Sequence, residues 1–126
     1  MRFHHVGIAC KNIAEEIESI SQIHTIVDQT PVVFDDAQNA ELVMLTLVDG
    51  TNLELIAGTQ VDNLSKKNST YYHICYEVDD MDAEIEKLLE NHAFLVSPPK
   101  PAILFDNSEV AFLSVSYGLI ELLSSK

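Results

Sequence analysis

Hydrophobic and polar positions alternate along two stretches of the chain, and each stretch runs directly into a helical pattern. The first stretch covers residues 2–10 and the second covers residues 71–78. Alternation of this kind predicts a β-strand with one buried face. Asn12 follows the first strand and Glu15 lies three residues later, which is the spacing of a helix N-cap and its capping-box partner. The pattern therefore predicts a strand and then a helix that ends near His24.

The second stretch is followed by a helix of the same kind. Asp79 or Asp80 is the predicted N-cap, and an apolar stripe at spacings of three to four residues continues to about Asn91. The two strands also share a histidine, because His73 lies 68 residues after His5. This recurrence indicates that the chain contains an internal repeat.

A β-hairpin is predicted between the two strand–helix units. Two apolar runs, 41–47 and 52–56, flank Val48-Asp49-Gly50-Thr51, and Asp-Gly is typical of a two-residue turn. Pairing outward from such a turn puts Leu45 opposite Glu54, and opposite residues share a face of the sheet. Glu41 would then share that face, so two carboxylates are expected on one otherwise apolar surface.

A second hairpin is predicted near the C-terminus, over residues 109–115 and 119–123. Its last strand places Glu121 67 residues after Glu54, in a similar run of leucine and isoleucine. Residues 97–101 contain three prolines and are expected to form an irregular loop. The chain is therefore expected to be a single domain, 1–126, in which two strand–helix–strand–strand–strand copies (about 1–58 and 71–126) are joined by a polar linker (59–70).

Composition narrows the range of functions. Seven basic residues against twenty acidic ones give a formal net charge of −13, which repels phosphate groups, so neither nucleic acid nor a membrane is an expected partner. The sequence has no apolar run of 18 residues and no secretory leader pattern. Two cysteines do not make a disulfide scaffold, so a reduced, cytoplasmic setting is expected.

Each copy carries one histidine on its first strand and one glutamate on its last strand. Taken singly, a strand histidine is more often a hydrogen-bonded core residue than a metal ligand. Taken together, the four residues favour a shared site, because an unpaired carboxylate inside an apolar strand is costly. If the copies pair about a pseudo-two-fold axis, a divalent ion such as Zn, Ni, Co or Mn would be bound by His5, Glu54, His73 and Glu121.

The chain resembles the vicinal-oxygen-chelate superfamily, which includes glyoxalase I, methylmalonyl-CoA epimerase and extradiol dioxygenases. The resemblance extends from His5-Val6-Gly7-Ile8-Ala9 to Gly118-Leu119-Ile120-Glu121-Leu122. The chain is most similar to the epimerase-like branch of this superfamily. Two segments carry that similarity: His73-Ile74-Cys75-Tyr76-Glu77-Val78-Asp79-Asp80 and Lys66-Lys67-Asn68. It implies an α+β fold in which two paired βαβββ modules form an open, cup-shaped mixed sheet with a central metal site, and it matches the same four residues to the ligand positions.

The resemblance also implies an activity. Members of the epimerase-like branch are homodimeric, metal-dependent isomerases or lyases that move a proton next to a carbonyl through a metal-chelated enediolate. Glu121 matches the position of a proton-transferring base. The position of Glu41 resembles that of a second base in the epimerases. Two bases would favour epimerisation over the glyoxalase outcome, in which the proton returns to the adjacent carbon. The expected substrate is a small molecule, either an acyl-CoA thioester or a thiol adduct of a 2-oxoaldehyde.

Three alternatives stay within the same superfamily. A lactoylglutathione lyase (glyoxalase I)-like enzyme usually uses arginines to bind the peptide carboxylates of its glutathione adduct. Arg2 is the only arginine in this sequence. A non-catalytic, resistance-type protein would only bind a small molecule, and such members often lose metal ligands. An Fe(II) oxygenase uses two histidines and one carboxylate, so a fourth, acidic ligand fits it less well. A CoA thioester would need a cation near its phosphates, and Lys66, Lys67 or Lys100 could provide it.

Overall fold

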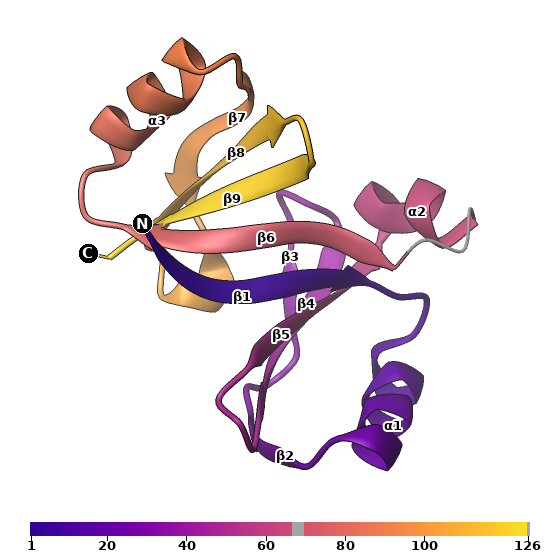
Figure 1. Ribbon diagram of the computed structural model, residues 1–126. Coiled ribbons are helices and arrows are strands. Elements are labelled where there is room, and N and C mark those ends of the chain that lie inside the picture. The colour runs from indigo at the N-terminus through magenta and orange to yellow at the C-terminus, as the bar shows by residue number, and fades with distance from the viewer. Residues whose placement is uncertain (67–69, 126) are drawn as a thin grey trace. The chain divides into compact units, whose positions relative to one another are not determined.

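The computed structural model describes residues 1–66 and 70–125. The chain divides into two compact units: residues 5–72 form the N-terminal unit, and residues 1–4 with 73–126 form the C-terminal unit. The elements of both units are labelled in Figure 1. Lys67 and Asn68, in the linker that resembles the epimerase-like branch, lie outside the described residues.

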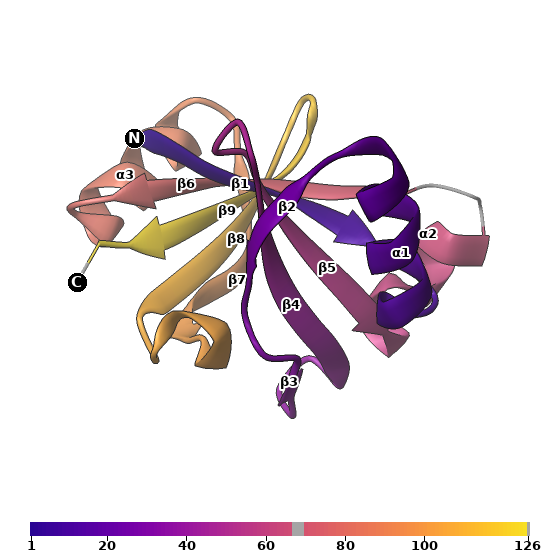
Figure 2. The same ribbon diagram turned by 90° about the horizontal axis from the view of Figure 1, so that it is seen from below.

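The N-terminal unit is built on a mixed sheet with the strand order β2-β4-β5-β1. Strands β4 and β5 form an antiparallel hairpin, whereas β5 and β1 run parallel. The short strand β3 pairs with the beginning of β4 (Figure 2). The elements are β1 (Arg2–Ala9, which begins in the other unit), α1 (Ile13–Ile23), β2 (Ile26–Gln29), β3 (Val33–Asp35), β4 (Ala40–Leu47), β5 (Asn52–Gly58), η1 (Thr59–Val61) and α2 (Asp62–Lys66).

Helix α1 covers one face of this sheet. The Asn12 side chain accepts a hydrogen bond from the Glu15 N–H at 2.9 Å, which satisfies one of the free donors at the start of the helix and confirms the predicted cap. The helix stops at Ile23, and the His24 N–H donates to the Ile20 carbonyl at 2.8 Å. Its isoleucine stripe packs on one cluster of buried sheet residues: Val43, Leu45, Leu55 and Ala57.

The C-terminal unit repeats this plan with the strand order β6-β9-β8-β7. Of the two aspartates predicted as helix caps, Asp80 is the cap, and it accepts from the Ala83 N–H at 3.1 Å. Helix α3 packs on the sheet face formed by Val78, Leu113, Ile120 and Leu122. The elements are β6 (Tyr71–Val78), α3 (Met81–Glu90), β7 (Phe94–Pro101), η2 (Ile103–Phe105), β8 (Glu109–Val115) and β9 (Gly118–Ser124).

Both units therefore follow the order strand–helix–strand–strand–strand, with the short β3 added in the first. The predicted α+β class and the two βαβββ modules are confirmed. None of the helices within residues 1–66 and 70–125 is long and apolar enough to cross a membrane.

The expectation of an irregular loop at residues 97–101 is wrong. These residues belong to β7, which runs from Phe94 to Pro101 and, among the described strands of its unit, pairs with β8 alone. A proline cannot donate a hydrogen bond to a neighbouring strand, and it is tolerated at the edge of a sheet and at bulges. Strand β7 is such an edge, and its register shifts at two places, between Leu95 and Ser97 and between Ser97 and Lys100.

The hairpin loop between β4 and β5 is one residue longer than predicted. The Leu47 N–H donates to the Thr51 carbonyl at 2.8 Å, so the loop consists of Val48, Asp49 and Gly50. Gly50 has a φ of 90°, as the last position of a three-residue hairpin loop requires. The Asp-Gly pair thus marks a turn, as expected, but a longer one.

The longer loop changes the register of the hairpin. Met44, rather than Leu45, lies opposite Glu54. Because side chains alternate between the two faces of a strand, a shift of one residue moves a whole set of side chains to the other face. The prediction that Glu41 shares a face with Glu54 is therefore wrong, and Glu41 lies on the face covered by α1.

Candidate functional site

The N-terminal unit contains a buried histidine–glutamate pair. The parallel register places Gly7 of β1 beside Glu54 of β5, and His5 is two residues before Gly7, so His5 and Glu54 share a face. The distance between His5 Nε2 and Glu54 Oε1 is 3.2 Å. The histidine side chain is 0% exposed and the glutamate side chain is 5% exposed.

The C-terminal unit contains a matching pair. Cys75 of β6 lies beside Glu121 of β9, and His73 is two residues before Cys75 on the same face. The distance between His73 Nε2 and Glu121 Oε1 is 3.1 Å, and the two side chains are 2% and 4% exposed. The internal repeat seen in the sequence is therefore a repeat of side-chain geometry as well.

The C-terminal pair has an aromatic neighbour that the sequence analysis missed. Phe112 of β8 lies opposite Glu121 in the antiparallel register. Its ring meets the ring of His73 edge-on, with the centroids 5.4 Å apart and an interplanar angle of 81°. Edge-to-face packing is a favourable arrangement of two rings and holds the imidazole in one orientation. Only the pairing of Phe112 with Glu121 across the hairpin could have indicated this role.

The residues of each pair fit a divalent metal ion. A histidine nitrogen and a carboxylate oxygen are common ligands of Zn and similar ions, which they bind at about 2.0–2.2 Å. Two adjacent ligands of one ion then lie about 3 Å apart, and this is close to the 3.1–3.2 Å between nitrogen and oxygen in the two pairs. Carboxylates this deeply buried also require a compensating partner, which a cation provides.

Glu41 lies apart from the histidine–glutamate pair of its own unit. In the register of the β4–β5 hairpin it shares a face with Val43 and Leu45, which pack against α1. Glu54 lies on the opposite face of the same sheet. The prediction that Glu41 shares the face of Glu54 is therefore corrected, because it depended on a two-residue turn.

Arg2, the only arginine in the chain, is engaged within the C-terminal unit. Its guanidinium lies 2.9 Å from an Asp79 oxygen and 3.4 Å from a Glu77 oxygen. The hydrogen bond from Arg2 lowers the pKa of Asp79 from its ordinary value. The only arginine thus already has two carboxylate partners. The sequence contains no second arginine that could bind a substrate anion.

Comparisons with known proteins give one family and a narrower set of relatives. A family model described as the Glyoxalase/Bleomycin resistance protein/Dioxygenase superfamily matches residues 4–112. The mitochondrial methylmalonyl-CoA epimerase of Dictyostelium discoideum is 26% identical over an alignment of 130 positions, which covers 96% of this chain and 76% of that protein.

Solved structures of epimerases share the fold. Methylmalonyl-CoA epimerase from Mycobacterium tuberculosis matches with a TM-score of 0.83 at 21% identity, over 99% of this chain and 88% of that one. A single-residue variant of Streptomyces coelicolor methylmalonyl-CoA epimerase, in complex with 2-nitronate-propionyl-CoA, matches with a TM-score of 0.75 at 22% identity, over 99% and 94% of the two chains.

Proposed function

Because the chain belongs to the glyoxalase/bleomycin resistance protein/dioxygenase superfamily, we propose that it is a metal-dependent isomerase that resembles methylmalonyl-CoA epimerase. The reaction would remove a proton from the carbon next to a thioester carbonyl and then return it to that carbon. The likeness to the epimerase branch expected from the sequence is confirmed by the relatives. The observation that carries the proposed activity is the repeated, buried histidine–glutamate pair.

We propose that one divalent ion, such as Zn, Ni, Co or Mn, is bound by both pairs together. Each pair offers one imidazole nitrogen and one carboxylate oxygen at the spacing of adjacent ligands. When bound, such an ion would supply Lewis-acid chemistry, which polarises a carbonyl. The proposed ligands are His5, Glu54, His73 and Glu121.

Glu121 is the proposed base. Its position in the family motif is that of the proton-transferring carboxylate, and its surroundings support the role. The side chain is 4% exposed, and Phe112 and Cys75 lie beside it in the sheet register. Glu121 would take the proton from the substrate carbon and return it.

The two-base arrangement expected from the sequence loses one member. Glu41 lies on the sheet face opposite Glu54, so this proposal does not use it as the second base. Glu121 alone suffices for proton exchange at the substrate carbon, and inversion additionally requires a proton delivered to the other side. Exchange and inversion are therefore separable reactions in this proposal.

An acyl-CoA thioester is the proposed substrate class. The Dictyostelium relative is a methylmalonyl-CoA epimerase, and the Streptomyces structure holds a nitronate analogue on CoA. Arg2 already has carboxylate partners, which fits this class better than the peptide carboxylates of a glutathione adduct. A homodimer and a cytoplasmic location remain predictions from the sequence.

Deuterium incorporation tests the proposed activity. The purified protein, loaded with Co or Zn, is mixed with methylmalonyl-CoA in D₂O, and the substrate C2 proton is followed by NMR. The expected result is metal-dependent loss of the C2 signal, abolished in Glu121→Gln. A parallel assay with the hemithioacetal of methylglyoxal and glutathione tests the glyoxalase alternative. Metal binding without exchange on either substrate would contradict the proposal and favour a binding protein.

A further inference from the structure

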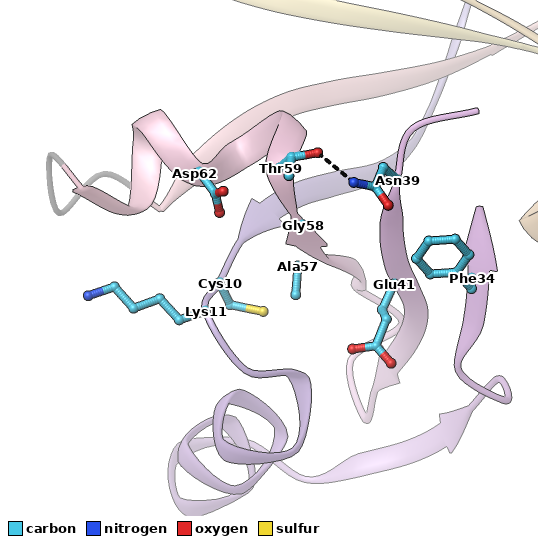
Figure 3. A pocket seen from close by; sticks show the side chains of 9 residues that line it. All are labelled: Cys10, Lys11, Phe34, Asn39, Glu41, Ala57, Gly58, Thr59 and Asp62. Carbon is cyan, nitrogen blue, oxygen red and sulfur yellow. Dashed lines mark hydrogen bonds between the residues drawn. The ribbon is translucent and has the colours of Figure 1, made fainter. Parts of the chain in front are cut away.

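A hollow of about 550 Å³ opens on the N-terminal unit, on the sheet face that carries α1 rather than the face of Glu54 (Figure 3). The ends of three strands and the segment after β5 surround it. None of its lining residues belongs to the histidine–glutamate pairs. The hollow is lined by Cys10, Lys11, Phe34, Asn39, Glu41, Ala57, Gly58, Thr59 and Asp62.

Strand register explains why a space exists here. Phe34 of β3, Glu41 of β4 and Ala57 of β5 lie opposite one another in a row across the sheet. Residues opposite each other share a face, with their Cβ atoms about 5 Å apart. Phe34 and Glu41 are therefore neighbours on the face that lines the hollow, while Ala57 leaves the next position nearly empty.

The backbone also keeps one end of the hollow tight. A Cβ atom on Gly58 would lie 2.4 Å from the Asn39 carbonyl oxygen, so only glycine permits this approach of β5 to the start of β4. The Asn39 amide donates to the Thr59 hydroxyl at 3.1 Å across the same end (Figure 3). The walls are thus positioned by the sheet itself.

Glu41 is available to a ligand. Among the side chains of residues 1–59, 61–64 and 70–125, the Glu41 carboxylate has no hydrogen-bond or ion-pair partner. Figure 3 shows the Lys11 side chain extending away from Glu41. Phe34 is 51% exposed, so its ring is also accessible.

The charges of the hollow favour a cation. Burial, together with the charge of Glu16, raises the pKa of Cys10 to about 11, so its thiol is neutral at neutral pH. Glu41 and Asp62 then outweigh Lys11, in a protein whose formal net charge is −13. The hollow residues in the described part of the chain form no group of three metal ligands close enough to hold a bare metal ion.

We propose that this hollow binds the ammonium group of a small organic cation, with the Glu41 carboxylate as counter-ion and the Phe34 ring as the second contact. A carboxylate beside an exposed aromatic ring is a suitable partner set for an alkylated ammonium, because the ring face attracts a cation and the carboxylate neutralises it. The alkyl part would lie over Ala57. No residue that lines this hollow is a proposed metal ligand.

A titration followed by NMR tests this proposal. The ¹⁵N-labelled protein is titrated with butylammonium chloride, and 1-butanol and sodium chloride at equal concentrations serve as the neutral and ionic controls. Saturable shifts are expected at the amides of Phe34, Glu41 and Ala57 with butylammonium alone. Glu41→Gln should weaken binding roughly threefold to tenfold, and Phe34→Leu should weaken it roughly threefold.

The chain offers a matched control in its second module. Glu109 is the repeat counterpart of Glu41 at the start of β8, but it lies opposite Pro101 instead of an aromatic residue. Glu109→Gln removes the same charge and should leave the butylammonium affinity unchanged. Equal weakening by Glu109→Gln and Glu41→Gln, or the same shifts with sodium chloride, would overturn the proposal, because both indicate a general charge effect.

Discussion

His73 and Glu121 bring an imidazole nitrogen and a carboxylate oxygen to 3.1 Å from each other inside the C-terminal unit, although one stands on its first strand and the other on its last. The N-terminal unit holds its own pair at 3.2 Å. Each of the two glutamates thus has a histidine nitrogen beside its carboxylate. They differ in the proposal because only Glu121 also transfers the proton.

The first prediction separates these two roles. Glu121→Gln should lower the rate of deuterium exchange at saturating metal by about 100-fold or more, because a general base contributes about 10²–10⁴ to a rate. Glu54→Gln should weaken metal binding about as much as Glu121→Gln does. It should nevertheless retain much more of the exchange rate at saturating metal. Calorimetry of metal binding and NMR of the thioester give the two readouts. Equal exchange rates for the two variants at saturating metal would remove Glu121 from its role as base.

The second prediction concerns Glu41. Because it lies on the face covered by α1, Glu41→Gln should leave the rates of both exchange and inversion within about twofold of the native protein. Circular dichroism of methylmalonyl-CoA or a coupled enzyme assay measures inversion, and NMR measures exchange. A selective loss of inversion would restore Glu41 as the second base and contradict the register seen here.

The error over Glu41 shows what sequence patterns can determine. The caps at Asn12 and Asp80 depend on a side chain and a backbone N–H three residues away, so local sequence predicts them. The turn at Asp49-Gly50 is equally local, but Asp-Gly suits loops of two and of three residues. Its length decides the register, and the register decides which face carries a carboxylate.

The third prediction tests the close approach at Gly58. Gly58→Ala would place a Cβ 2.4 Å from one backbone atom and 2.6 Å from another, so the strands must move apart. The free energy of unfolding should fall by about 1–3 kcal/mol, as for other overpacked sites. Urea denaturation measures it. Gly50→Ala is the control for loss of a glycine, since a Cβ there meets nothing within 4 Å and only the positive φ is strained. A Gly58→Ala variant as stable as the native protein would contradict the packing described.

The fourth prediction concerns the Cys10 thiol, whose pKa burial raises from 9.0 to about 11. At pH 8 the thiolate fraction should be about 100-fold below that of an unfolded chain, and alkylation by iodoacetamide should be slower by at least that factor. Peptide mapping after timed alkylation measures Cys10 separately from Cys75. The raised pKa also means that its contribution to stability is complete below pH 9 and is lost as the pH rises toward 11. Alkylation as fast in the native protein as in urea would refute its burial.

Tertiary contacts explain the other features that the sequence did not reveal. The prolines of β7 are compatible with a strand only because β7 is an edge strand of its unit, a property that local sequence does not record. Phe112 looks like any core aromatic until β8 pairs with β9 and sets its ring against His73. The buried histidines and glutamates could be predicted because each copy of the repeat carries one histidine and one glutamate at matching positions.

A metal titration tests the central proposal most directly. The metal-free protein is titrated with Co²⁺, and both the absorption spectrum and the number of bound ions per chain are recorded for the native protein, His5→Ala and His73→Ala. The account predicts one ion per chain, with the affinity lowered about 100-fold or more by either substitution, because both histidines would bind the same ion. Two ions per chain, each lost in only one of the variants, would contradict a shared site, and so would the absence of binding to the native protein.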